Sequence, residues 1–68
     1  INMYGENNVI KLFQKMGDEF TKVETDTEKF VEGNNSAGTR VRKSMQVVKQ
    51  LAQQIRVEIQ NQKNSVTA

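Results

Sequence analysis

The sequence contains no cysteine, no histidine and no proline among its 68 residues. Without cysteine it can form neither disulfide bonds nor thiolate metal sites. Without histidine it lacks a common zinc ligand, the most frequent general base and a side chain that changes charge near neutral pH. No set of residues suggests acid–base or nucleophilic chemistry. We therefore expect no enzyme, no catalytic residues, no metal, no cofactor and no small-molecule substrate.

Apolar residues are also scarce. They make up 35% of the chain, whereas about 45–50% is usual for globular proteins. No apolar run exceeds two residues, which is too short for a transmembrane helix or a signal-peptide core, and we expect no membrane partner. A chain of this size is near the limit for a self-sufficient core. We expect one domain, residues 1–68, that needs a partner subunit.

Two segments have the spacing of amphipathic helices. Apolar residues recur at alternating intervals of four and three, which is the pattern of a coiled-coil seam. The predicted seam consists of Val9, Phe13, Met16, Phe20, Val23, Thr27 and Phe30 in the first segment and Val41, Met45, Val48, Ala52, Ile55 and Ile59 in the second. The pattern predicts an all-α fold, because neither segment alternates as a strand does.

The expected elements are a helix at about 7–31, a turn at 32–35, a helix at about 36–62 and a frayed tail at 63–68. Asn7 or Asn8 can cap the first helix, and Asn35 or Ser36 the second. Gly33 can adopt the left-handed conformation that ends a helix. Such a short turn requires an antiparallel, coiled-coil-like hairpin.

Some apolar residues lie off the predicted seam and would be exposed in a single hairpin. They are Ile10, Leu12, Val31, Val47, Leu51 and Val57. This surplus favours a homodimer in which two hairpins form a four-helix bundle. Two glycines lie inside the predicted helices, where glycine is unfavourable, and their presence requires an explanation. Gly38 suits close packing or the approach of a ligand, whereas Gly17 has no evident role.

Charge is divided unevenly between the two halves. Residues 1–33 contain four lysines and seven acids, a net charge of −3, and residues 34–68 contain six bases and one acid, a net charge of +5. Four of these bases recur at intervals of seven and form what we call the basic stripe: Arg42, Lys49, Arg56 and Lys63. Across the predicted seam only one acid, Glu24, would face it, so much of the positive charge stays available to a polyanion.

The segment GNNSAGTRVRK, residues 33–43, joins the two helices and opens the basic stripe. Helix N-termini present unpaired amides that favour phosphate, and Arg40, Arg42 and Lys43 lie within a turn of this one. The segment is not a P-loop, because the pattern G-x-x-x-x-G-K-[ST] does not occur. Capping alone explains its Gly33 and Asn35, and a solvated helix face is the alternative for its bases.

Residues 29–65 resemble bacterial linker-histone-like proteins of the chlamydial histone-like family. The resemblance rests on Lys29-Phe30, Gly33-Asn34, Ala37 to Lys43, Leu51-Ala52 and Ile55-Arg56. It implies a histone-like, nucleoid-associated protein that binds DNA without sequence preference and helps to organise chromosomes, or to package DNA. Chlamydial members continue into a lysine-rich tail, so this short form is expected to act architecturally rather than by strong condensation.

Carried over to this chain, the resemblance implies a cytoplasmic, nucleoid location, or a virion if the source is a phage. Partners would be DNA, with RNA a further candidate, and a second copy of the chain. The residues expected at DNA are Arg40, Arg42, Lys43, Lys49, Arg56, Lys63, Thr39 and Asn34. The competing hypothesis is a structural or scaffolding hairpin that self-assembles or binds a protein, for example in a virion or particle.

Overall fold

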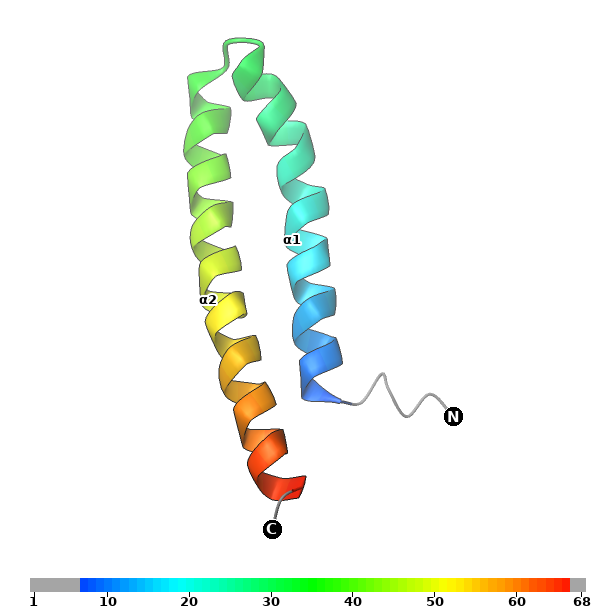
Figure 1. Cartoon of the computed structure of the whole chain (residues 1–68). Coiled ribbons are helices and arrows are strands. Elements are labelled where there is room, and N and C mark those ends of the chain that lie inside the picture. Colours follow the sequence, from blue (N-terminus) through cyan, green and yellow to red (C-terminus); the bar gives the residue numbers. More distant parts are fainter. Residues whose placement is uncertain (1–6, 67–68) are drawn as a thin grey trace, which may run out of the picture.

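The computed structural model describes residues 7–66, with side chains as far as Asn64. Within that range it contains two helices, α1 (Asn8–Val31) and α2 (Asn35–Val66), and no strand. The helices run antiparallel and are joined at one end of the molecule (Figure 1). The predicted all-helical hairpin is thus confirmed. Helix α2 continues four residues past the expected end at 62, and residues 67–68 of the expected tail lie outside the described residues.

Local hydrogen bonds fix the ends of both helices. The Asn7 side chain accepts a bond from the Val9 amide at 2.8 Å and caps α1. Helix α1 ends in a Schellman-type turn, in which Gly33 has φ 111° and the amide of Asn34 donates to the Lys29 carbonyl. The Asn34 side chain then accepts from the Ala37 amide at 3.0 Å. The expected cap at Asn35 or Ser36 is therefore wrong by one residue, because α2 begins earlier.

The two helices meet along an inter-helix seam that differs from the predicted one at every second position. Its buried and half-buried members are Val9, Leu12, Met16, Glu19, Val23 and Asp26 on α1 and Ala37, Val41, Ser44, Val48, Leu51, Ile55, Glu58 and Gln62 on α2. Half of the predicted seam is present, for example Val23 and Ile55. The alternate members Phe13, Phe20, Met45 and Ile59 are 40–52% exposed instead. That part of the prediction is wrong.

Side-chain size explains the difference. Near the turn, α2 presents Ala37, which is 0% exposed, and Ser44, which is 4% exposed, and such small residues let the helices approach closely. Phe20 or Met45 would hold the helices apart at that point. Leu51, expected off the seam, is accordingly in the core at 7% exposure, whereas Val31, Val47 and Val57 stay exposed.

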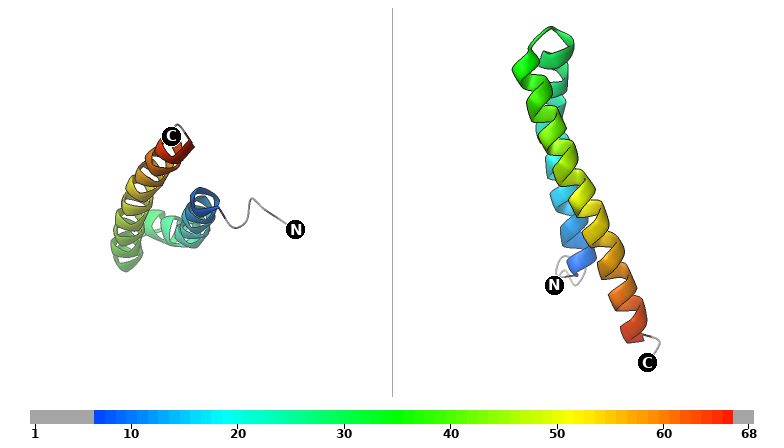
Figure 2. Two further views of the ribbon diagram at one scale, coloured as in Figure 1. Left: turned by 90° about the horizontal axis from the view of Figure 1, so that it is seen from below. Right: turned by 90° about the vertical axis from the view of Figure 1, so that its left-hand side faces the viewer.

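The displaced apolar residues gather on one side of the hairpin. Four of them follow a seam residue by one position, and in antiparallel right-handed helices that step turns toward the same side. Phe30 does not, but its ring lies over Gly38 on that same side. We call Phe13, Phe20, Phe30, Met45 and Ile59 the exposed apolar face. The hairpin is a single layer of two helices (Figure 2), so neither helix covers this side.

Phe30 reaches this side across the first turn of α2. A Cβ atom built on Gly38 would lie 2.6 Å from the Phe30 ring, so the glycine serves close packing, one of its two expected roles. At Gly17 a Cβ would meet nothing within 4 Å. The hairpin itself therefore does not require a glycine at position 17.

We predict that Gly38→Ala lowers the free energy of unfolding by about 1 kcal/mol, because overpacking against the ring outweighs the better helix propensity of alanine. In a Phe30→Ala background the same change should instead be stabilising by up to about 1 kcal/mol. Urea unfolding of the four proteins in this cycle measures both effects. A loss of equal size in both backgrounds would contradict the contact.

Candidate nucleic-acid interface

The basic stripe lies along the outer edge of α2, on the same side of the hairpin as the exposed apolar face. Arg42, Lys49 and Arg56 are exposed and each follows a seam residue by one position, and Lys63 continues the series with an exposed side chain. At about 1.5 Å per residue, successive members are about 10 Å apart and the stripe is about 32 Å long. That length is close to one turn of a B-form duplex, about 34 Å. A straight helix thus presents four cations along a distance over which phosphates of both strands recur.

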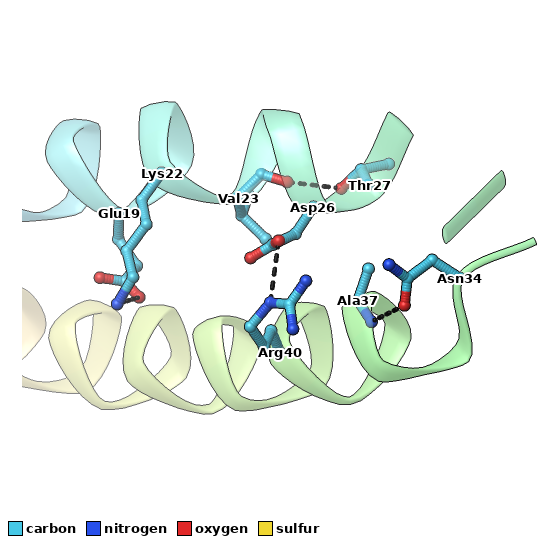
Figure 3. Close-up of polar contacts among 8 residues, drawn as sticks. All are labelled: Glu19, Lys22, Val23, Asp26, Thr27, Asn34, Ala37 and Arg40. Atoms are coloured by element: carbon cyan, nitrogen blue, oxygen red, sulfur yellow. Dashed lines mark hydrogen bonds and ion pairs between the residues drawn. The ribbon is translucent and has the colours of Figure 1, made fainter. Parts of the chain in front are cut away.

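The three bases near the turn point in different directions, because each residue advances about 100° around a helix. Arg40 faces α1, where its Nε lies 2.9 Å from Asp26 Oδ1 (Figure 3). Lys43 lines a groove between the helices together with Lys22 and Val47. Of this cluster only Arg42 belongs to the basic stripe.

Two further expected site residues lie close to the turn. The carboxamide oxygen of Asn34 is occupied by the α2 cap (Figure 3), so what that residue offers a ligand is its amide group. Thr39 is exposed and lies beside the Phe30 ring, on the outer side of the first turn. Neither residue is in line with the basic stripe.

Glu24 does not face the basic stripe across the hairpin. It lies on the surface of α1 with Phe20, Thr27 and Glu28. The expected pairing is wrong because the stripe is on the outside of α2, one position away from the seam. The bases that meet acids are on the opposite side of the hairpin, where Lys22 Nζ is 4.0 Å from Glu19 Oε1 and Arg40 meets Asp26. The basic partner of each pair is 48% exposed or more, so solvent screens the pair and it contributes about 1 kcal/mol or less.

Sequence reasoning did not identify two features of this surface. Asp26 is the acid that orients Arg40, and its side chain is only 14% exposed. The exposed Gln46 and Gln53 lie beside the stripe, each about one helical turn after a stripe residue. Their side-chain amides are neutral hydrogen-bond donors that can contact a phosphate. The sequence did contain a signal for these two glutamines, because they are seven residues apart, as neighbouring members of the stripe are.

The sequence model of a family described as histone H1-like protein Hc1 matches residues 10–65. The chain belongs to the histone H1-like Hc1 family. No curated protein and no solved structure matches the chain. Family membership confirms the resemblance found in residues 29–65 and extends it through most of α1.

The Hc1 family places the chain among histone-like, DNA-binding proteins of the nucleoid. The matched range includes every member of the basic stripe and nearly all of the inter-helix seam. Neither described helix is long and apolar enough to cross a membrane. The described residues also contain no cluster of acids that could hold a metal ion. The candidate interface is the basic stripe, whose members all lie within the matched range.

We predict that Asp26→Asn raises affinity for duplex DNA more than Asp18→Asn does, although both changes remove one negative charge. Only the first removes the charge that holds Arg40 Nε at 2.9 Å, and the weaker bond to a neutral amide competes less with a phosphate for the guanidinium. The salt dependence should steepen by about 0.9 log unit per log unit of salt for that added contact. Fluorescence anisotropy at several salt concentrations measures both quantities. Equal effects of the two changes would place Arg40 outside the interface.

Proposed function

We propose that this Hc1-family chain organises DNA by binding the phosphate backbone through the basic stripe, without preference for base sequence. The observation that supports the proposal most directly is the register of Arg42, Lys49, Arg56 and Lys63 on the outer side of α2. Backbone contacts position a protein on a duplex but contain no sequence information. A regular helix with exposed cationic side chains about 10 Å apart suits that role.

The form of the surface supports lack of sequence preference. Direct base recognition usually places several side chains of one short helix segment in the major groove. Here the four cations are spread over about six turns, with one cation every second turn. Arg40 and Lys43 lie on other sides of α2 near the turn, so they extend the positive charge around that end rather than along the stripe. Thr39 and the amide of Asn34 lie at that same end.

We also infer that the hairpin functions as a dimer. Three large apolar side chains are buried in it, Val23, Leu51 and Ile55, whereas eight described ones are substantially exposed. Such a ratio is typical of a subunit rather than of a complete domain. A four-helix bundle would bury the exposed apolar face.

We predict that the triple change of Arg42, Lys49 and Arg56 to Gln weakens binding to unrelated duplexes uniformly. Each lost phosphate contact should reduce the salt slope by about 0.9. The matched control changes Lys11, Lys15 and Lys29 to Gln, which removes the same charge from α1. Fluorescence anisotropy at about 50–200 mM salt distinguishes them, since the loss should be at least about tenfold larger for the first set.

Equal losses for the two triple variants would show that net charge, and not the basic stripe, determines binding. No binding of the unaltered chain at low salt would refute the nucleic-acid function itself. Competition by duplex RNA of the same length tests whether the interface prefers DNA. Circular dichroism of all variants should show unchanged helicity, because the altered side chains are exposed.

A further inference from the structure

The exposed apolar face is large for a hairpin of this size. Its three phenylalanines are 47–52% exposed, and Met45 and Ile59 are 40% and 41% exposed. Together they expose on the order of 400 Å² of apolar surface. That is about half of what each partner contributes to a standard interface, and the adjoining seam edges would supply more.

The spacing of this face indicates what covers it. Each helix has apolar residues at seam positions and further ones directly after a seam position, on the exposed apolar face. On α1 an example is Val9 and Leu12 in the seam and Phe13 on the face. This wider pattern is typical of helices in a bundle, which contact two neighbours, whereas a two-stranded coil needs only the narrower one. Both helices repeat the pattern every seven residues, so a second hairpin of the same sequence fits the face in length and in period.

We propose that a second copy of the chain packs its exposed apolar face against this one with both turns at the same end. The two basic stripes then lie on opposite edges of a four-helix bundle, and one dimer holds two DNA duplexes. The bridging of two duplexes rests on the proposed function. The packing of the two copies does not.

The two edges of the exposed apolar face decide the orientation. The α2 edge is the basic stripe, and the corresponding positions on α1 are Ile10, Gly17, Glu24 and Val31. A twofold axis parallel to the helices places the stripe of one copy beside the α1 edge of the other. A twofold axis across the helices would instead place the two basic stripes side by side. Repulsion between adjacent like charges disfavours the second arrangement.

Contacts between the helices show which residues lie at the same height along the hairpin axis, and such residues are called level. Asn8 meets Glu58 and Asp26 meets Arg40, which places Phe20 level with Met45 and Glu24 level with Arg42. An axis parallel to the helices preserves these levels between copies. Phe20 then packs against Met45 of the second copy, a favourable sulfur–aromatic contact. Glu24 comes beside Arg42 of the second copy.

Farther from the turn the edge stays cationic. Lys49 is level with Gly17 and Arg56 with Ile10, by the same contacts. Neither residue would have an acid opposite it, and Gly17 adds no side chain that could shield Lys49. Each edge therefore keeps cations for phosphate. The bundle is two helices wide, so the two edges are about 20 Å apart and each can hold its own duplex.

Sedimentation equilibrium tests the interface with a matched pair of variants. Phe20→Glu places a charge on the exposed apolar face and should raise the dimer dissociation constant at least about tenfold. Val57→Glu adds the same charge at a residue that is equally exposed, 48% against 47%, but lies off that face, and it should leave the constant nearly unchanged. A monomeric unaltered chain, or equal effects of the two variants, would overturn the proposal.

A single spin label tests the orientation. The chain has no cysteine, so Ser36→Cys gives one labelling site beside the turn. Two copies with turns at the same end would place the labels within about 20 Å, given helix separations of about 8–10 Å. Turns at opposite ends would separate them by about 40 Å, the length of a helix. A distance near 40 Å in the dimer would overturn the proposed arrangement.

Capture of a second duplex tests bridging. Beads with a bound duplex are incubated with the chain and then with a fluorescent duplex of unrelated sequence. We expect the unaltered chain and Val57→Glu to retain the fluorescent duplex, and Phe20→Glu to bind the beads but retain at least about tenfold less of it. Binding to the beads without capture by a dimeric chain would overturn bridging alone. Absence of bead binding would refute the proposed function instead.

Discussion

A connection of only three residues, Glu32 to Asn34, obliges the two helices to meet within the first turn of α2, and the side chains there decide which faces can meet. Ala37 and Ser44 are small enough to be covered completely or nearly so, and Gly38 leaves room for the Phe30 ring. Once these residues face α1, helical periodicity sets the rest of the inter-helix seam. The large apolar residues are consequently turned to one side, and the basic stripe to the outer edge of α2.

The sequence contained enough information to predict the helices, the turn and the antiparallel pairing, because spacing and capping are local. It did not determine the seam. Val9, Met16 and Val23 belong to two overlapping apolar series, one that includes Leu12 and one that includes Phe13, and hydrophobicity favours the second. Within the hairpin the first is used, although it includes Glu19 and Asp26, because close approach near the turn depends on side-chain volume. Volume across an interface is not a property of either segment alone.

The candidate interface could be predicted in part for the same reason. The interval of seven places Arg42, Lys49 and Arg56 on one face of any straight helix, so the stripe did not depend on the seam. The assignment of Arg40 to that surface did depend on it. The observed seam is rotated around α2 relative to the predicted one. As a result Arg40 faces Asp26 and points away from Arg42. Charges that lie near a helix contact can be assigned only when the contact is known, whereas charges on the far side can be assigned from spacing.

Salt should act differently on the two surfaces, because one is apolar and the other is cationic. Association through the exposed apolar face needs no ions and is not weakened by screening. Each phosphate contact, in contrast, loses strength with rising salt, and a dimer that holds two duplexes loses contacts on both edges at once. Because two linked weak sites bind far more tightly than either alone, the loss of one edge greatly reduces retention at the other. Moderate salt would thus separate the duplexes while the protein dimer persists, so that DNA organisation responds to ionic conditions without dissociation of the subunits.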